Sequence, residues 1–172
     1  MYIESEDHLD RSADEVYPLV RDELPKLLPY LPDVEALEQL SYERVSDTRV
    51  KIVNRWKAKA KIPKAAAKFL PPDIFTWTDH AEWKDDEYSV DYRLEGFGYE
   101  VKGRNSFKPD NGGTRLKVTA EITVYPEKFK IPRFLFDKVF PLVEGVVKKA
   151  LQPNLTALAR GLKDYYADQK AG

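Results

Sequence analysis

Residues 134–166, FLFDKVFPLVEGVVKKALQPNLTALARGLKDYY, decide the fold because they place apolar side chains at every third or fourth position. This spacing puts the apolar side chains on one face of a helix and the charged ones on the opposite face. At about 1.5 Å per residue, the helix would be roughly 45–50 Å long. A helix of this length needs a large apolar surface to lie on. Its apolar face comprises Phe136, Phe140, Val143, Val147, Leu151, Leu155, Leu158, Leu162 and Tyr165.

Two prolines interrupt this predicted helix. Pro153 lacks the N–H that would bond to the carbonyl of Lys149, so we expect a kink near Lys149. Pro141 marks either a second kink or the true start of the helix, with residues 134–139 as a separate turn.

The surface that the helix requires is predicted upstream, where seven segments have the pattern of β-strands. In the last five, apolar and polar residues alternate, which is typical of strands with one core face and one solvent face. The second strand is less regular, so we expect a β-bulge in it. After the first strand, Ser12 to Glu15 form a capping-box sequence that predicts a helix from about Ala13. The seven segments are residues 2–9, 34–45, 49–61, 75–84, 88–95, 99–108 and 115–124.

The order of these elements predicts a single α+β domain over residues 1–172. A seven-stranded antiparallel sheet with one apolar face can bury that face by curling around the long C-terminal helix, a helix-grip fold. This order resembles the START-like (SRPBCC) superfamily, which includes birch-pollen-allergen-like proteins and polyketide cyclases. The resemblance rests on residues 9–20 with Ser-x-Asp-Glu-Val-Tyr, on Asp33-Val34 and on the C-terminal helix. It implies a deep apolar cavity between sheet and helix that holds lipids, sterols, polyketides or other apolar molecules.

Composition and missing motifs narrow the possible functions. The chain has no cysteine, which excludes disulfides and a thiol nucleophile. Residues 1–10 lack an apolar run and no stretch reaches the roughly 20 apolar residues of a membrane span, so we expect a soluble, cytoplasmic protein. His8 and His80 lie on the predicted solvent side without a third ligand, so no metal is expected. Without a glycine-rich phosphate motif or a nucleophile elbow, no cofactor is predicted.

The core-facing positions of the predicted sheet are rich in aromatic residues. A well-filled core would explain them, and so would a cavity lined by rigid amphipathic rings. The family resemblance favours the cavity for at least some of them. The predicted ligand-binding residues are Asn54, Trp56, Trp77, Asp79, Trp83, Tyr92, Phe97, Tyr99, Asn105, Phe136, Phe140, Val143 and Val147.

Three polar side chains fall among these core-facing positions. Burial raises the pKa of a carboxyl group, and it is costly unless the group is hydrogen-bonded. If Asp85-Asp86 is a two-residue turn, Asp79 faces Tyr92 across the strands. Asp79 is then a buried pair with Tyr92, part of a small internal water cluster, a polar anchor for a ligand, or a general acid–base acting with Tyr92 or Tyr99. The three polar residues are Asn54, Asp79 and Asn105.

Three functional hypotheses follow from these patterns. The first is a binding or transfer protein for an apolar or amphipathic, lipid-like small molecule held between the sheet and the C-terminal helix. The second is a cyclase- or dehydratase-type enzyme that acts on an apolar or polyketide-like substrate in the same cavity. The third is a structural or regulatory module with a collapsed cavity. The core-facing residues are mostly apolar, which favours the binding protein over an enzyme.

The net charge of −1 hides a strongly basic block in the middle of the chain. Residues 49–70 carry a net charge of +8, whereas residues 1–48 carry −9. In the strand at 49–61, however, the basic residues occupy the alternate positions of the solvent face. Since the pI is near 6.2 and no RNA-binding aromatic signature is present, nucleic-acid binding is not predicted.

Three loops are expected to meet at one rim of the sheet: 61–74, 96–98 and 126–133. Apolar residues would be ringed there by basic ones, which predicts a cavity mouth that docks transiently on anionic membranes. Alternatively, the apolar residues plug the rim and the lysines only solubilise it. The predicted docking residues are Lys61, Ile62, Lys64, Phe69, Lys128, Lys130, Ile131 and Arg133.

Overall fold

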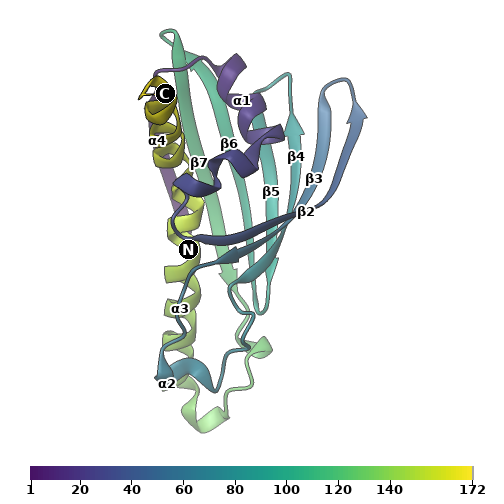
Figure 1. Ribbon diagram of the computed structural model, residues 1–172. Coiled ribbons are helices and arrows are strands. Elements are labelled where there is room, and N and C mark those ends of the chain that lie inside the picture. Colours follow the sequence, from purple (N-terminus) through teal and green to yellow (C-terminus); the bar gives the residue numbers. More distant parts are fainter. Residues whose placement is uncertain (172) are drawn as a thin grey trace.

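The computed structural model describes residues 1–171 and confirms the predicted α+β architecture (Figure 1). A seven-stranded sheet curls around a long helix at the C-terminal end of the chain. The strands are β1 (Tyr2–Leu9), β2 (Val34–Ser46), β3 (Arg49–Ala58), β4 (Thr76–Lys84), β5 (Ser89–Gly96), β6 (Tyr99–Asp110) and β7 (Gly113–Val124). The α-helices are α1 (Ala13–Asp22), α2 (Lys64–Ala67), α3 (Phe136–Thr156) and α4 (Leu158–Ala171), with 3-10 turns η1 (Leu24–Tyr30), η2 (Pro126–Lys128) and η3 (Arg133–Leu135).

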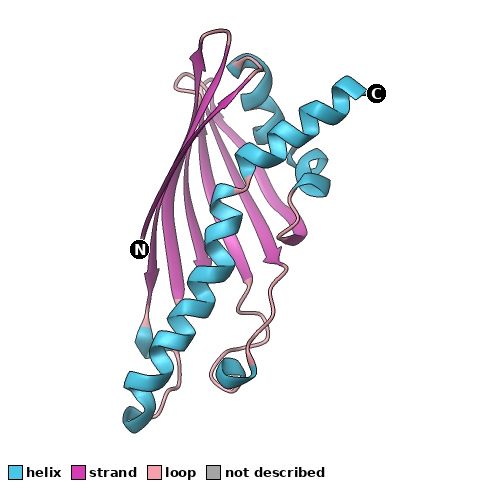
Figure 2. Cartoon of the chain, turned by 90° about the vertical axis from the view of Figure 1, so that its left-hand side faces the viewer, coloured by secondary structure: helices cyan, strands magenta, loops and turns pink. Residues whose placement is uncertain are grey.

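The sheet is an open antiparallel meander. Its strand order is β1-β7-β6-β5-β4-β3-β2, so β1 and β2 are the two edges. The predicted bulge is present in β2, where the pairing with β3 shifts at three places. Helix α3 runs along the concave face of the sheet, as Figure 2 shows. The confirmed arrangement is therefore a helix held in a curled sheet.

The apolar stripe of α3 faces this concave side. Val143 and Val147 are wholly inaccessible to solvent, and Leu151 is 1% exposed. They pack against buried residues of the sheet such as Val101 and Ile122. Burying each such side chain contributes roughly 1.5–3 kcal/mol, so this stripe is a main source of stability.

The prediction of a kink near Lys149 is wrong. Helix α3 continues through Pro153 to Thr156, and the chain changes direction at Ala157, where α4 follows (Figure 2). Two side chains explain the break just after the proline. Asn154 Nδ2 donates to the Ala150 carbonyl at 2.7 Å, and Thr156 Oγ1 donates to the Gln152 carbonyl at 3.1 Å. Such back-bonding competes with the main-chain pattern and bends helices.

Of the two alternatives considered for Pro141, the one that made it the true start of the helix, with 134–139 as a separate turn, is wrong. The helix begins at Phe136, after the short turn η3, and Pro141 lies inside it. Pro141 is thus neither the start of the helix nor the end of a separate turn at 134–139.

The capping box before α1 does not form, although the helix begins at Ala13 as predicted. Ser12 is the N-cap residue but its side chain makes no capping hydrogen bond. Glu15 is instead 3.5 Å from Arg11 Nη1, which draws its carboxylate away from the Ser12 backbone. The competing ion pair explains the wrong prediction.

Helix α4 and the turn η1 close the upper end of the domain. Gly161 of α4 is buried, and a Cβ atom there would lie 2.8 Å from Leu31 Cδ2 and 3.2 Å from the Tyr30 carbonyl oxygen. Only glycine allows this approach between the two segments. Within residues 1–171, none of the helices is long and apolar enough to cross a membrane.

Candidate functional site

The predicted pairing of β4 with β5 is wrong by two residues. Asp79 is opposite Leu94, and Tyr92 is opposite Ala81. The turn has four residues, 85–88, because the last pair of the two strands is Lys84 with Ser89.

Tyr88 explains the longer turn. It adopts a left-handed conformation with φ of 48°, and its hydroxyl donates to the Asp14 carboxylate of α1. This tertiary contact takes Tyr88 out of the strand. A shift of two residues leaves every side chain on its predicted face. Asp79 and Tyr92 therefore both still face the concave side of the sheet.

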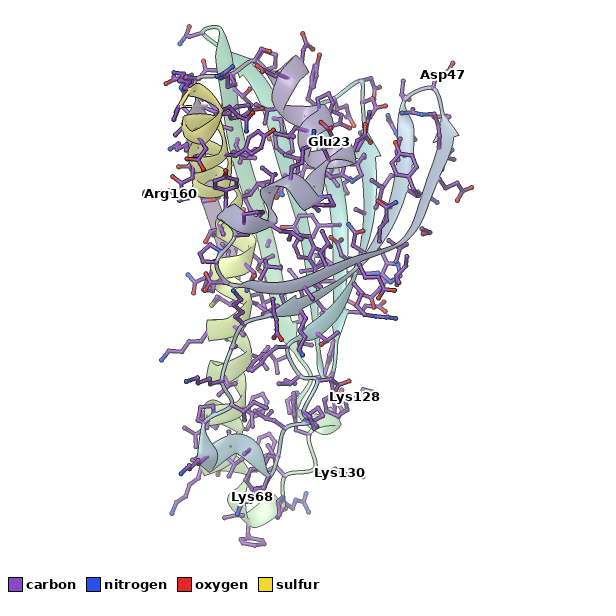
Figure 3. The ribbon with its side chains drawn as sticks, viewed as in Figure 1. Glu23, Asp47, Lys68, Lys128, Lys130 and Arg160 are labelled. Carbon is purple, nitrogen blue, oxygen red and sulfur yellow. The ribbon has the colours of Figure 1, made fainter. Side chains whose placement is uncertain are left out.

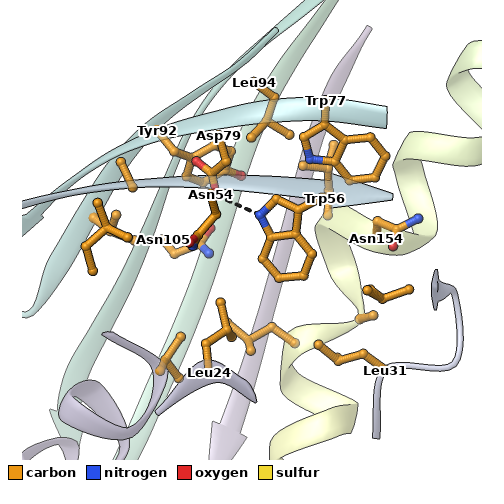
Figure 4. A pocket seen from close by; sticks show the side chains of 18 of the residues that line it. Leu24, Leu31, Asn54, Trp56, Trp77, Asp79, Tyr92, Leu94, Asn105 and Asn154 are labelled. Carbon is orange, nitrogen blue, oxygen red and sulfur yellow. Dashed lines mark hydrogen bonds between the residues drawn. The ribbon is translucent and has the colours of Figure 1, made fainter. Parts of the chain in front are cut away.

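A cavity of about 130 Å³ lies between strands β3–β6, the segment from α1 through η1 to β2, and the α3–α4 junction (Figure 4). Its lining is mainly apolar and aromatic. Seven of the predicted ligand-binding residues line it: Asn54, Trp56, Trp77, Asp79, Trp83, Tyr92 and Asn105.

A polar group lies in one wall of this cavity, centred on Asp79. The indole Nε1 of Trp56 donates to Asp79 Oδ2 at 3.2 Å, and Asn54 is directly opposite Asp79 on β3. Figure 4 shows Asp79, Asn54 and Asn105 grouped on the sheet side. Asp79 as a whole keeps part of its surface on the cavity, but its Oδ1 is buried without a hydrogen-bond partner among the described residues.

Burial of the Asp79 carboxyl group raises its pKa to about 7, and the hydrogen bond from Trp56 only partly offsets this effect. No cation of the described residues forms an ion pair with Asp79. Of the other charged residues in the lining, Arg21 is held by Asp22 and Asp85. Asp79 is thus a carboxyl group that gains or loses a proton close to neutral pH.

Tyr92 lies next to this group. Burial and the nearby Asp79 carboxylate both raise the pKa of the Tyr92 hydroxyl well above its ordinary value, so it stays protonated. Asn105, one strand further on, has a buried Oδ1 without a partner among the described residues. The wall therefore contains a titratable acid, a phenol and two amides within a mainly apolar lining.

Six predicted ligand-binding residues lie outside this cavity. The Tyr99 hydroxyl donates to the Ile74 carbonyl at 2.9 Å, which satisfies it within the core. Phe97 is 45% exposed and packs edge-on against Phe129. The rest lie in α3. These are Phe136 and Phe140, which stack on each other, and Val143 and Val147 in the core.

The rim at the lower end of the sheet is not the mouth of this cavity. Ile62, Phe69 and Ile131 are half-buried and pack against the core cluster that fills that end of the sheet. None of them lines the cavity. The apolar residues plug the rim, as the second alternative expected of them, because side chains from two loops pack there and exclude water.

Sequence reasoning missed the helical side of the cavity. Leu24, Leu31 and Asp33 come from the segment around η1, whose proline-rich sequence gives no periodic signal. Asn154 could have been found, because it lies three residues after Leu151 on the apolar face of the helix. The missed lining residues are Val20, Arg21, Leu24, Leu31, Asp33, Val34, Ile52, Ala81, Val90, Leu94, Leu151, Asn154, Leu155, Ala157 and Leu158.

A second hollow, which we call the groove, adjoins the cavity. It also measures about 130 Å³ and shares Asp33 and Asn154 with the cavity lining. Its walls are the segment from Lys59 to Pro63 on one side and α3 from Val146 to Asn154 on the other. Three lysines line it: Lys59, Lys61 and Lys149. None of these three is within ion-pairing distance of an acid in the part of the chain described, and Asp33 is the single acidic residue of the lining.

Among residues 1–171, no group of three or more His, Cys, Asp or Glu side chains is arranged to hold a metal ion. The polar groups of the cavity wall around Asp79 are its carboxyl group, the Tyr92 hydroxyl and the amides of Asn54 and Asn105. Their arrangement can donate and accept hydrogen bonds and can exchange one proton near neutral pH.

No family model matches the chain, and no curated protein matches it in sequence. Among solved structures, TTHA0849 from Thermus thermophilus is 26% identical, with a TM-score of 0.69 over 98% of this chain and 99% of that one. The Zhui aromatase/cyclase from Streptomyces sp. R1128 is 17% identical, with a TM-score of 0.63 over 95% and 93% of the two chains. The di-domain ARO/CYC StfQ from the steffimycin biosynthetic pathway is 14% identical, with a TM-score of 0.60 over 100% of this chain and 53% of that one. These likenesses show the fold: the chain has a helix-grip fold, with a seven-stranded antiparallel sheet around a long C-terminal helix.

Proposed function

We propose that this protein binds, and transfers, a small apolar or amphipathic molecule in the cavity between the sheet and the α3–α4 junction. The observation that supports this most directly is the lining, which is mainly apolar and aromatic, with polar groups in the wall around Asp79 and at Arg21, Asp33 and Asn154. An apolar lining with a few placed polar groups is typical of small-molecule sites. The volume is close to the roughly 150 Å³ of an engineered cavity that holds benzene, so one ring of a larger ligand would fit there without rearrangement and the rest would extend into the adjoining groove.

The polar wall would orient the ligand. Below about pH 7 the Asp79 carboxyl group is neutral and can donate a hydrogen bond, whereas above that pH it can only accept. Trp56 and Trp77, paired directly across β3 and β4, offer ring surfaces beside it. A ligand with a ring and a carbonyl or hydroxyl group matches this arrangement. Its ring would pack against the indoles, and its polar group would hydrogen-bond to Asp79.

The groove suggests that the ligand is amphipathic and acidic. Lys59, Lys61 and Lys149 stand against a single acid, Asp33, so the groove is positively charged. Because the groove adjoins the cavity at Asp33 and Asn154, a ligand body in the cavity could extend an anionic group into it.

Two fluorescent probes test this proposal. N-phenyl-1-naphthylamine is uncharged, and 8-anilinonaphthalene-1-sulfonate has the same ring system with an added sulfonate. Both should bind and fluoresce. Ala81→Leu, which fills the cavity from β4, should weaken both at least about 10-fold. Neutralising the three groove lysines to Gln should weaken the sulfonate probe and spare the uncharged one.

The outcomes separate the two parts of the proposal. Wild-type affinity of Ala81→Leu for the uncharged probe would exclude the cavity as the binding site. Equal loss of both probes in the lysine variant would exclude the groove as an anion subsite. Native mass spectrometry of the purified protein would identify a small molecule that remains bound.

A second candidate is a cyclase- or dehydratase-type enzyme that acts on a polyketide-like substrate. It is favoured by one observation, the Asp79 pKa of about 7, which suits a general acid–base at neutral pH. Asp79 would remove a proton from the carbon between two carbonyl groups. That carbon would bond to a further carbonyl carbon, whose oxygen would take the proton back, and loss of water would follow. Tyr92 would donate a hydrogen bond to the carbonyl oxygen, but Tyr99 is committed to Ile74.

The enzyme hypothesis is tested with a linear poly-β-ketone, with mass spectrometry following cyclised and dehydrated products. The wild type should accelerate product formation over buffer, and Asp79→Asn should abolish that acceleration while the uncharged probe still binds. Equal rates for wild type, variant and buffer would exclude the enzyme hypothesis, and only the binding function would remain.

A further inference from the structure

The end of the molecule below the sheet is strongly basic. Two segments form it, residues 59–75 and 126–138, which we call the basic end (Figure 3). Together they carry a net charge of +5, whereas the whole chain carries −1, so the rest carries −6. All eight cations are exposed: Lys59, Lys61, Lys64, Lys68, Lys128, Lys130, Arg133 and Lys138.

These cations differ from most of the others in the molecule because they have no acidic partner within ion-pairing distance among the described residues. Elsewhere the basic residues are commonly paired, as Arg104 is with Asp91 and Lys117 with Glu4. Within residues 1–171, every ion pair lies outside the basic end. The charges of the basic end are therefore free to meet an external anionic surface.

One large apolar side chain projects from this end. Phe134, in η3, is 86% exposed, more than any other large hydrophobic residue of the described chain. It follows Arg133 directly, whereas Ile62, Phe69 and Ile131 of the same end are packed into the core. Leaving a phenylalanine in water forgoes the free energy of burying it, unless a partner covers the ring.

We infer that the basic end docks on an anionic lipid surface, with Phe134 inserted among the lipids and the surrounding cations at the headgroups. A bilayer fits both features, because anionic headgroups attract scattered, flexible lysines and the layer beneath them accepts one ring. Of the residues expected to dock from sequence, the basic ones keep this role. The apolar ones do not, and Phe134 takes their place.

Docking would also bring the ligand site near the membrane. Lys59 and Lys61 belong to both the basic end and the groove. From Phe136 to Lys149, α3 rises about 1.5 Å per residue, which puts the groove roughly 20 Å from the tip. The docking itself does not depend on the cavity, so a variant with a filled cavity should still dock.

The test is co-sedimentation of the full chain with vesicles of phosphatidylcholine alone or with added phosphatidylserine. Binding should require phosphatidylserine and weaken as salt rises. Replacing Lys128, Lys130 and Arg133 by Glu should weaken binding at least about 100-fold. Phe134→Ser should weaken it at least about 10-fold.

Matched controls change the same properties elsewhere. Lys51→Glu, Lys108→Glu and Lys170→Glu together give the same net charge from exposed lysines outside the basic end, and Val45→Ser removes an apolar side chain that is 51% exposed on β2. Both controls should bind like the wild type, and all variants should keep its melting temperature. Absence of wild-type binding to phosphatidylserine vesicles would overturn the inference, even if an acidic protein bound the basic end instead. Equal loss in variants and controls would overturn it too.

Discussion

The ring of Tyr92 occupies the space that a side chain at Gly103 would need. The two residues are directly opposite on β5 and β6, and a Cβ atom at 103 would lie 2.4 Å from the Tyr92 Cζ. The absence of a side chain on β6 thus sets the position of the phenol in the cavity wall. A Cβ atom at position 103 would also lie 2.7 Å from the Thr119 carbonyl oxygen, so neighbouring atoms leave no room for a side chain at Gly103.

Gly103→Ala should push the Tyr92 ring into the cavity. We expect a loss of stability of about 1–3 kcal/mol and weaker binding of the uncharged naphthylamine probe. Urea denaturation and probe titration measure the two effects. Adding Tyr92→Leu to this variant should recover part of both losses, because the clash with the ring is gone. Unchanged binding by Gly103→Ala would show that Tyr92 does not border the probe.

The raised pKa of Asp79 should make stability depend on pH. An unfolded aspartate has a pKa near 3.9, so between about pH 4 and 7 only the folded state holds the proton. Stability should therefore fall as pH rises through this window, by at most about 1.4 kcal/mol per pH unit, and the contribution should level off above pH 7. Urea denaturation of Asp79→Asn should lack this slope and give higher stability than the wild type at pH 8.

Asp73→Asn, which changes an exposed aspartate, is the control and should keep the slope. Parallel stability profiles of wild type and Asp79→Asn would mean that Asp79 titrates at its ordinary pKa.

Trp56 should lower the pKa of Asp79, because its indole N–H stabilises the carboxylate. Trp56→Phe keeps an aromatic ring and removes the donor. We expect the Asp79 pKa to rise by about one pH unit, measured from the carboxyl ¹³C chemical shift. Trp77→Phe should leave the Asp79 pKa unchanged, since no hydrogen bond from Trp77 to Asp79 is present among the described residues. A lower pKa in Trp56→Phe would contradict the role of this bond.

Two helical glycines should respond oppositely to alanine. At Gly145 of α3 a Cβ atom would meet nothing within 4 Å, so Gly145→Ala should stabilise by about 0.5–1 kcal/mol. At Gly161 of α4 it would lie 2.8 Å from Leu31 Cδ2, so Gly161→Ala should destabilise. Thermal unfolding of the pair measures both signs. Stabilisation by Gly161→Ala would mean that α4 is not held against η1.

Val147→Asp should unfold the domain, because Val147 is inaccessible to solvent and its neighbours offer no partner for a charge. Gln152→Asp places the same charge on an exposed position of α3 and should keep the fold. Circular dichroism during heating distinguishes the two. A near-wild-type melting temperature for Val147→Asp would contradict the packing of α3 on the sheet.

The periodic parts of the chain determined the fold. Alternation in the strands and the three-to-four spacing around Val143 and Val147 are local properties, and each fixes which side chains share a face. Those faces suffice to assign seven strands, a long helix and the cavity-side position of Asp79. They also placed Asn54, Trp56 and Asn105 on that side.

The tertiary structure alone decided the register, the site of the cavity and the docking tip. Asp79 pairs with Leu94 because Tyr88 leaves the strand to bond with Asp14 of a distant helix. Side chains from many segments fill the lower end of the sheet. The cavity therefore lies at the α3–α4 junction, and Phe134 is exposed to solvent. Periodicity assigns a side chain to a face, but how fully a space is packed depends on residues far apart in sequence.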